Sequence, residues 1–162
     1  MTFTIREAQT SDLDALKEFT EQAFEPIFES FLKIMGTDIF ALAYPDWRTL
    51  QRNLVETMFK DEKTLVCVAD KEGVAVGLVC YTLNQEEKSG EIQFLVVHPD
   101  YQNDGIGTAL NDYTLQKMRD AGIKLAVVGT GGDVAHAPAR RAYEKSGFVA
   151  LPSVWYFKKL AD

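Results

Sequence analysis

Residues 97–108 read VHPDYQNDGIGT and join a predicted strand to a predicted amphipathic helix. Gly105 and Gly107 allow the backbone to turn tightly and to approach a ligand closely. The first N–H groups of the following helix have no partner within it, and the helix dipole is positive at that end. The segment therefore indicates a site for an anion such as a pyrophosphate.

Two common nucleotide-binding motifs do not fit this segment. A dinucleotide fingerprint needs a third small residue where Leu110 stands, and a P-loop needs a Gly-Lys-Ser/Thr triplet that does not follow Gly105. Two glycines at this spacing also occur in ordinary tight turns. The glycines alone therefore leave a turn without a ligand as an open alternative.

The elements around this segment predict the fold class. Hairpin-linked strands come first and strand–helix–strand units follow, which indicates an α/β (α+β) mixed sheet with helices on both faces, in one domain over residues 1–162. Ser11 is expected to cap the first helix. The predicted strands are 3–8, 64–69, 74–83, 91–97, 124–128, 148–149 and 154–160, and the other predicted helices are 47–60, 108–121 and 138–145.

Composition excludes several classes of protein. The net charge of −7 argues against nucleic acid or an anionic membrane surface as a partner. The absence of a signal peptide and of about 18 consecutive apolar residues predicts a cytoplasmic protein without a membrane span. Cys67 and Cys80 lie in apolar runs without metal-ligand spacing, so we expect a buried, reduced pair and no bound metal.

Two motifs together resemble the GNAT acyltransferase superfamily. Its first signature, V-x-P followed by Q/R-x-x-G-x-G/A, matches residues 97–99 and 102–107. Its second signature, N-x-x-A-x-x-x-Y-x-x-x-G-F, matches residues 136–148, with His136 where the family often has Asn. The resemblance covers roughly residues 63–157.

The resemblance implies a GNAT-like, mostly antiparallel sheet that is splayed between the strands 91–97 and 124–128. The pantetheine arm of acetyl-CoA, the cosubstrate, would lie in that opening and pair with the backbone as an added strand would. Asp104 is expected to point to solvent, because its charge would repel the pyrophosphate. The cofactor-binding residues implied in this way are Leu95, Val96, Val97, Gln102, Asn103, Asp104, Gly105, Ile106, Gly107, Thr108, His136 and Tyr143.

The resemblance also implies catalytic residues. Tyr143 matches the family tyrosine that protonates the departing thiolate, although a packed aromatic residue on the helix is the alternative. Glu91 precedes the cofactor strand, where some members carry a catalytic glutamate, and burial there would raise its pKa. Its alternative is an exposed strand-end carboxylate, and Asp133 and His136 are rival bases. His136 is otherwise a cofactor contact or a structural residue.

The expected reaction is transfer of an acetyl group to a primary amine of a small molecule or a peptide. The aromatic-rich residues 24–47 are either the wall of the acceptor site or an aromatic core. Family members dimerise through the late strands, so the resemblance implies a homodimer with Trp155 and Tyr156 at the interface. A non-catalytic acyl-CoA-binding module is the competing function.

Overall fold

The computed structural model describes residues 2–162, which form two compact units. The first unit comprises the residues up to Ala23 together with Leu50–Gly129, and the second comprises Phe24–Thr49 and Thr130–Asp162. Helices α1 (Leu13–Met35) and α3 (Trp47–Lys60) each contribute residues to both units. A single domain over residues 1–162 stays a prediction.

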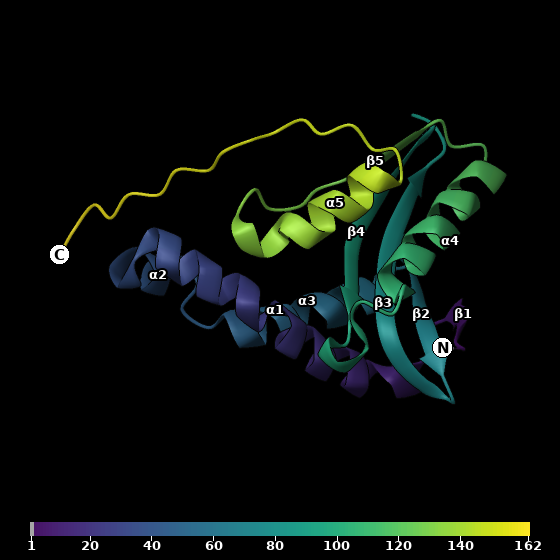
Figure 1. Ribbon diagram of the computed structural model, residues 1–162, viewed down its shortest axis with the longest axis horizontal. Coiled ribbons are helices and arrows are strands. Elements are labelled where there is room, and N and C mark those ends of the chain that lie inside the picture. The colour runs from purple at the N-terminus through teal and green to yellow at the C-terminus, as the bar shows by residue number, and fades with distance from the viewer. Residues whose placement is uncertain (1) are drawn as a thin grey trace. The chain divides into compact units, whose positions relative to one another are not determined.

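The first unit contains a five-stranded sheet with the order β1-β2-β3-β4-β5 (Figure 1). The pairs β1–β2, β2–β3 and β3–β4 are antiparallel, and β5 runs parallel to β4. This topology confirms the predicted mixed, mostly antiparallel sheet. The strands are β1 (Thr4–Glu7), β2 (Leu65–Lys71), β3 (Val74–Asn84), β4 (Ser89–Val97) and β5 (Leu125–Val128).

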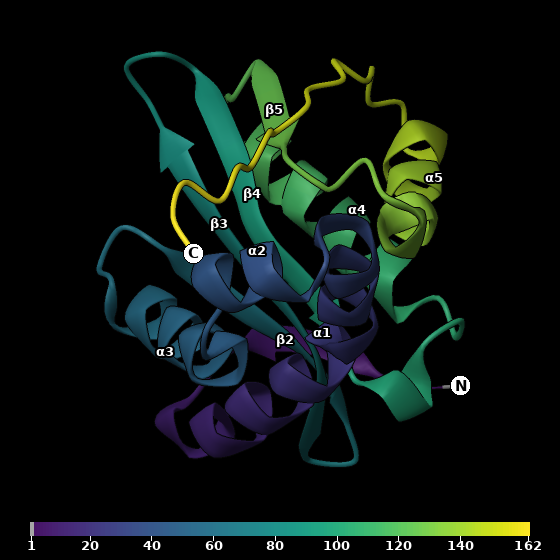
Figure 2. The same cartoon turned by 90° about the vertical axis from the view of Figure 1, so that its left-hand side faces the viewer.

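Helices cover both faces of this sheet, as predicted. Figures 1 and 2 show α4 (Ile106–Asp120) on one face, with the first half of α1 and the body of α3 on the other. The central strand β3 is accordingly buried from Ala75 to Tyr81. A Cβ at Gly77 would lie 2.8 Å from Cγ2 of Ile106, so this glycine permits the close approach of α4 to the sheet.

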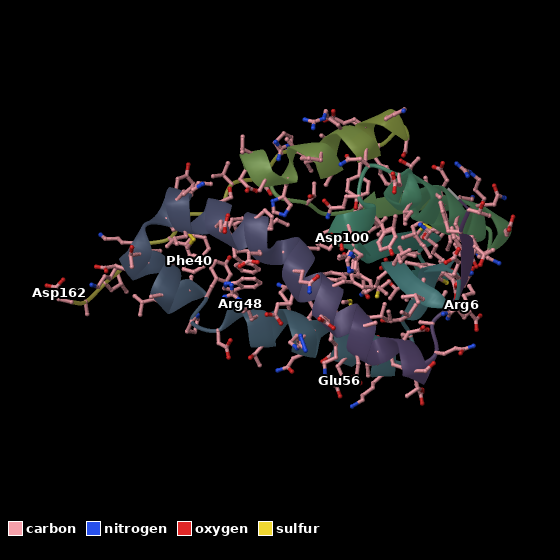
Figure 3. All side chains as sticks on the ribbon, turned by 60° about the horizontal axis from the view of Figure 1, so that its bottom comes forward. Arg6, Phe40, Arg48, Glu56, Asp100 and Asp162 are labelled. Atoms are coloured by element: carbon pink, nitrogen blue, oxygen red, sulfur yellow. The ribbon has the colours of Figure 1, made fainter. Side chains whose placement is uncertain are left out.

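Arg6 ties β1 to the start of the first helix and to the end of β2 (Figure 3). Its guanidinium donates to Asp12 at 2.8 and 2.9 Å and to Asp70 at 2.7 Å. These hydrogen bonds hold the pKa of both carboxyls below their usual range. Asp12 also accepts the N–H of Gln9 at 2.7 Å. The predicted cap at Ser11 is therefore wrong, because the turn Thr10–Asp12 (η1) precedes α1 and Asp12 makes the capping hydrogen bond.

The second unit is helical. It contains the second half of α1, the short helix α2 (Thr37–Ala43), the turn η3 (Val134–His136) and α5 (Ala137–Lys145). Helix α5 begins one residue before the predicted start and ends at the predicted residue. Pro138 lies in its first turn, where the missing N–H of proline removes no helical hydrogen bond.

The predicted strands 148–149 and 154–160 are wrong. Within residues 2–162 no strand follows β5, and residues 148–162 have neither helix nor strand. Their apolar side chains are largely exposed, including Trp155 at 82% and Tyr156 at 91%. β-propensity is realised only against a neighbouring strand, and this segment has no hydrogen-bonded strand partner in the described chain. The homodimer stays a prediction.

Candidate functional site

The strands β4 and β5, the last pair in the sheet, part after a short stretch of pairing. Their parallel pairing runs from Ser89 opposite Leu125 to Ile92 opposite Val128, where β5 ends. Strand β4 continues without β5 to Val97 while remaining paired to β3 on its other edge. The second half of β4 therefore has one edge that β5 does not cover, as the predicted splay requires.

The register decides which backbone groups face this open edge. His98 donates its N–H to the carbonyl of Val76, on the side of β3, at 2.9 Å. Since backbone groups alternate between the two edges of a strand, those of Leu95 and Val97 face away from β3, and those of Val96 face toward it. Gln102 donates its side-chain amide to the carbonyl of Val97 at 3.2 Å, which confirms that this carbonyl is on the open edge.

The turn from β4 to α4 holds the other predicted cofactor residues. Gly105 precedes the helix with a φ of +79°, and Asn103 has a φ of +66°. Ile106 is 1% exposed and anchors the helix start. A Cβ at Gly107 would lie 3.6 Å from Val97 and 3.7 Å from Leu95, so the first turn of α4 lies against the open end of β4.

Charge at this helix start is compatible with an anion. No acidic residue lies in the first turn of α4, and Lys117 and Arg119 lie in its last turn. Asp104 is exposed, as expected, and Gln102, Asn103 and Thr108 are exposed as well. The turn therefore combines an uncovered strand edge with the positive end of a helix dipole. The binding roles of these residues stay predictions.

The structure distinguishes the two alternatives for Glu91. It pairs with Val127 of β5 and Thr82 of β3, but its side chain is exposed. It lies on the same face of β4 as Gln93, which is also exposed. The exposed alternative for Glu91 is therefore the one that the structure supports, because alternation along β4 directs Ile92 and Phe94, and not Glu91, into the core.

In the second unit, the aromatic residues of segment 24–47 form one cluster. Phe28 and Trp47 stack at its centre, with ring centroids 4.4 Å apart, and are 4% and 8% exposed. The half-buried rings of Phe24, Phe31, Phe40 and Tyr44 surround them, and Figure 3 labels Phe40 on α2. The cluster thus has a core at its centre and an accessible rim.

A second group of side chains joins this rim. Asp133 accepts a hydrogen bond from the hydroxyl of Ser30 at 2.6 Å and bonds Nδ1 of His136 through its other oxygen. The His136 ring stacks on Phe31, with centroids 5.9 Å apart. Arg140 donates to the carbonyls of Gly131 and Asp133 at 2.6 and 2.7 Å.

The charge state of Asp133 follows from these contacts. Burial raises the pKa of its carboxyl, but the hydrogen bonds from Ser30 and His136 outweigh burial and hold the pKa below its usual range. Asp133 is therefore a carboxylate at neutral pH. Sequence reasoning named Asp133 and His136 separately but missed Ser30, which lies 103 positions from Asp133 and carries no local signal.

Tyr143 lies on α5, half-buried, and packs edge-on against Phe148 with centroids 5.7 Å apart. Burial raises the pKa of its phenol, so it stays protonated at neutral pH. A protonated phenol is the form that a general acid requires. The geometry is thus compatible with both the catalytic and the packing interpretation of Tyr143.

A mixed sheet that parts beside a glycine-bearing helix start is the class of fold that the resemblance to the GNAT superfamily implied. A sequence model described as the acetyltransferase (GNAT) family matches residues 22–148. That match covers well over half of the chain, and the protein therefore belongs to the GNAT acetyltransferase family.

Similar proteins agree with this assignment. A mycothiol acetyltransferase of Streptomyces coelicolor is 32% identical over 82 residues, which cover 51% of this chain and 26% of that protein. An uncharacterized N-acetyltransferase of Archaeoglobus fulgidus is 30% identical over 97 residues, 57% of this chain and 65% of that protein. The matches therefore span only part of these relatives.

A crystal structure of PaiA N-acetyltransferase from Thermoplasma acidophilum, in complex with coenzyme A, has the same fold. Its TM-score is 0.71 at 16% identity, with 97% of this chain and 96% of that chain covered. Among residues 2–162, no group of three or more His, Cys, Asp or Glu side chains is arranged to hold a metal ion. In the same part of the chain, no helix has the length and apolar character of a membrane span.

Proposed function

We propose that the protein transfers the acetyl group of acetyl-CoA to a primary amine of a small molecule or peptide, by direct attack of the amine on the thioester. The observation that carries this proposal is the uncovered edge of β4 beside the first turn of α4. An extended pantetheine arm would pair with Leu95 and Val97, and the diphosphate would accept hydrogen bonds from the amides of residues 103–108.

The chemistry needs an acid and a base besides alignment. An alkylamine has a pKa near 10.4, so exposing its free base at neutral pH costs about 4–5 kcal/mol. Alignment of two bound reactants lowers a barrier by roughly 7–11 kcal/mol. Positioning therefore supplies most of the rate, and a nearby base must still remove the proton of the amine.

We assign the acid role to Tyr143, because burial keeps its phenol protonated at neutral pH and leaves a proton available for the departing thiolate. Glu91 is one candidate for the base, and its exposure favours action through water over direct contact. The Asp133–His136 pair is the other candidate. A non-catalytic acyl-CoA-binding module would need neither a general acid nor a general base.

We expect the acceptor to be an amine whose remaining part is apolar or carries a further positive charge. The half-buried rings at the rim of the aromatic cluster offer π-faces, which attract ammonium groups by about 0.5–1 kcal/mol at exposed sites. Some matched relatives are mycothiol acetyltransferases, which supports an amine on a small polar molecule. We further propose that the protein acts in the cytoplasm, as a homodimer.

An acceptor screen tests this function. Release of free thiol from acetyl-CoA is measured with a panel of polyamines, aminoglycosides, amino acids, amino-sugar thiols and peptides. We expect at least one amine to give saturable release and an acetylated product of the expected mass. Tight binding of acetyl-CoA without release for any amine would instead favour the non-catalytic acyl-CoA-binding module.

A further inference from the structure

We propose that His136 is the base that takes the proton from the acceptor ammonium, and that Asp133 positions its ring for this step. The inference rests on the proposed function and deepens it, because it names the proton acceptor at the acceptor side of the site. In this proposal the base role of His136 takes the place of the cofactor contact that the family's Asn would make at this position.

The tautomer of His136 carries the argument. The Asp133 carboxylate has only acceptor sites, and it bonds Nδ1 of the imidazole. Nδ1 must therefore carry the ring proton, which leaves the lone pair of a neutral imidazole on Nε2. No hydrogen bond to Nε2 is made within the described residues 2–162. His136 thus presents a basic nitrogen, the arrangement that an imidazole needs to accept a proton.

Several contacts hold this pair in place. Ser30 of α1 donates to the second oxygen of Asp133, and Arg140 of α5 fixes the loop through two backbone carbonyls. Phe31 of α1 stacks on the imidazole. The Asp133 side chain is 8% exposed and the His136 side chain 15%. Of the charged groups in this cluster, the Asp133 carboxylate bonds the imidazole directly, and the Arg140 guanidinium bonds the backbone carbonyls of the same loop.

The same contacts place His136 at the rim of the aromatic cluster. Phe31, which stacks on His136, also stacks on Tyr44 with centroids 5.7 Å apart and packs edge-on against Phe28. An acceptor whose body lies on the rim would bring its ammonium to the imidazole. The buried centre of segment 24–47 agrees with the core alternative, and the wall alternative stays a prediction.

The protons and bonds balance as follows. The acceptor ammonium gives one proton to Nε2 of His136 and becomes a free amine. The amine nitrogen attacks the thioester carbonyl, the C–N bond forms and the C–S bond breaks. The thiolate takes the phenol proton of Tyr143, and the nitrogen of the new amide releases its second proton, which restores the phenol through water. His136 returns its proton to solvent, so one proton is released per acetyl group transferred.

His136→Asn separates this role from the alternatives. Asparagine keeps a donor toward Asp133 and is also the residue that the family often has here. A cofactor contact or a structural role would therefore survive the change, whereas a base would be lost. We expect kcat to fall about 100-fold, within the usual range for loss of a general base. The control is Glu144→Gln, a substitution of an exposed residue on α5. The dissociation constant for acetyl-CoA and the melting temperature of His136→Asn should match those of this control.

The pH profile tests the pair as a unit. Wild-type kcat/KM should decline toward acid pH as Nε2 becomes protonated, and His136→Asn should abolish that acid limb. Asp133→Asn should lower kcat about tenfold and move the limb to lower pH, because the charge that favours the imidazolium is removed. An unchanged rate and profile in His136→Asn, with an active wild type, would overturn the inference and leave the proposed function intact.

A readout independent of turnover completes the test. The chain has two histidines, so ¹⁵N NMR of the imidazoles with His136→Asn as the assignment control resolves His136. We expect the tautomer protonated at Nδ1 in the wild type and a mixture in Asp133→Asn. A wild-type ring protonated at Nε2 would contradict the inference by itself. A wild type without turnover on any amine would overturn both proposals.

Discussion

The turn 102–108 after β4 and the segment 131–136 before α5 both carry predicted site residues, but they offer different chemical groups. The turn offers backbone amides at a helix start, and its side chains, apart from Ile106 and Gly107, are exposed. The segment 131–136 offers side chains, and Ser30, Phe31 and Arg140 hold these in place.

This difference follows from what each task demands. A diphosphate is large and multiply charged, so amides and a helix dipole bind it without any particular side chain. Proton transfer depends on one atom with a defined tautomer, so it needs a side chain fixed by partners. We therefore expect substitutions in the turn to change cofactor affinity, and substitutions near residues 131–143 to change turnover.

After His136→Asn, the largest effect is expected from Tyr143→Phe. Loss of the phenol removes the proton donor to the thiolate, so kcat should fall tenfold or more, while KM for acetyl-CoA barely moves. Steady-state kinetics with thiol detection measures both constants. The control is Tyr156→Phe, because Tyr156 is 91% exposed. An unchanged kcat would exclude Tyr143 from the mechanism and support its packing role.

Gly131→Ala should lower kcat about tenfold with little change in acetyl-CoA affinity. The added Cβ would overlap Nδ1 of His136, so the imidazole must leave its place beside Asp133. Gly132→Ala is a matched control, since its Cβ would meet no atom within 4 Å. Equal kinetics for the two variants would show that the Asp133–His136 geometry does not matter for turnover.

Gly105→Ala should raise the dissociation constant of acetyl-CoA several-fold. A φ of +79° costs an L-residue about 1–2 kcal/mol, and the turn relaxes to relieve this strain. Gly122→Ala, beyond the other end of α4, has a φ of +74° and carries the same strain far from the predicted amides. Calorimetric titration of both variants should show weaker binding only for Gly105→Ala, and equal weakening would argue against this turn as the diphosphate site.

The smallest effect is expected from Asp104→Asn. Its carboxylate is exposed, so removal of the negative charge should tighten acetyl-CoA binding only about twofold at low salt, with less effect as ionic strength rises. The same titration measures this change. Looser binding by the variant would mean that Asp104 is not beside the phosphates.

The two regions also differ in how far the sequence predicts them. The turn was predictable because its glycines, its proline and the following helix are contiguous. Helix α3 has the predicted bounds, 47–60, since helical periodicity is likewise a local signal. The hairpin link between the strands 64–69 and 74–83 was also predicted, and Glu72 and Gly73 in this link have positive φ.

What the sequence did not predict depends on distant partners. Ser30 contributes to the predicted site only because α1 brings it to Asp133, and no spacing signals that contact. Glu91 is exposed because its side chain is on the face of β4 that points away from the core, and the sequence alone does not decide which face that is. The β-branched and aromatic residues in segment 154–160 indicated a strand, but a strand needs a hydrogen-bonded neighbour, and none of the sheet's strands pairs with it.

Titration of the ¹⁵N-labelled protein with coenzyme A tests most directly whether the turn binds cofactor through its backbone. We predict that the largest amide shifts occur at residues 103–108 and at Leu95 and Val97, and that the amides of residues 120–124 at the other end of α4 barely move. Saturable binding that leaves the amides of residues 103–108 unmoved would contradict the account, as would the absence of any binding.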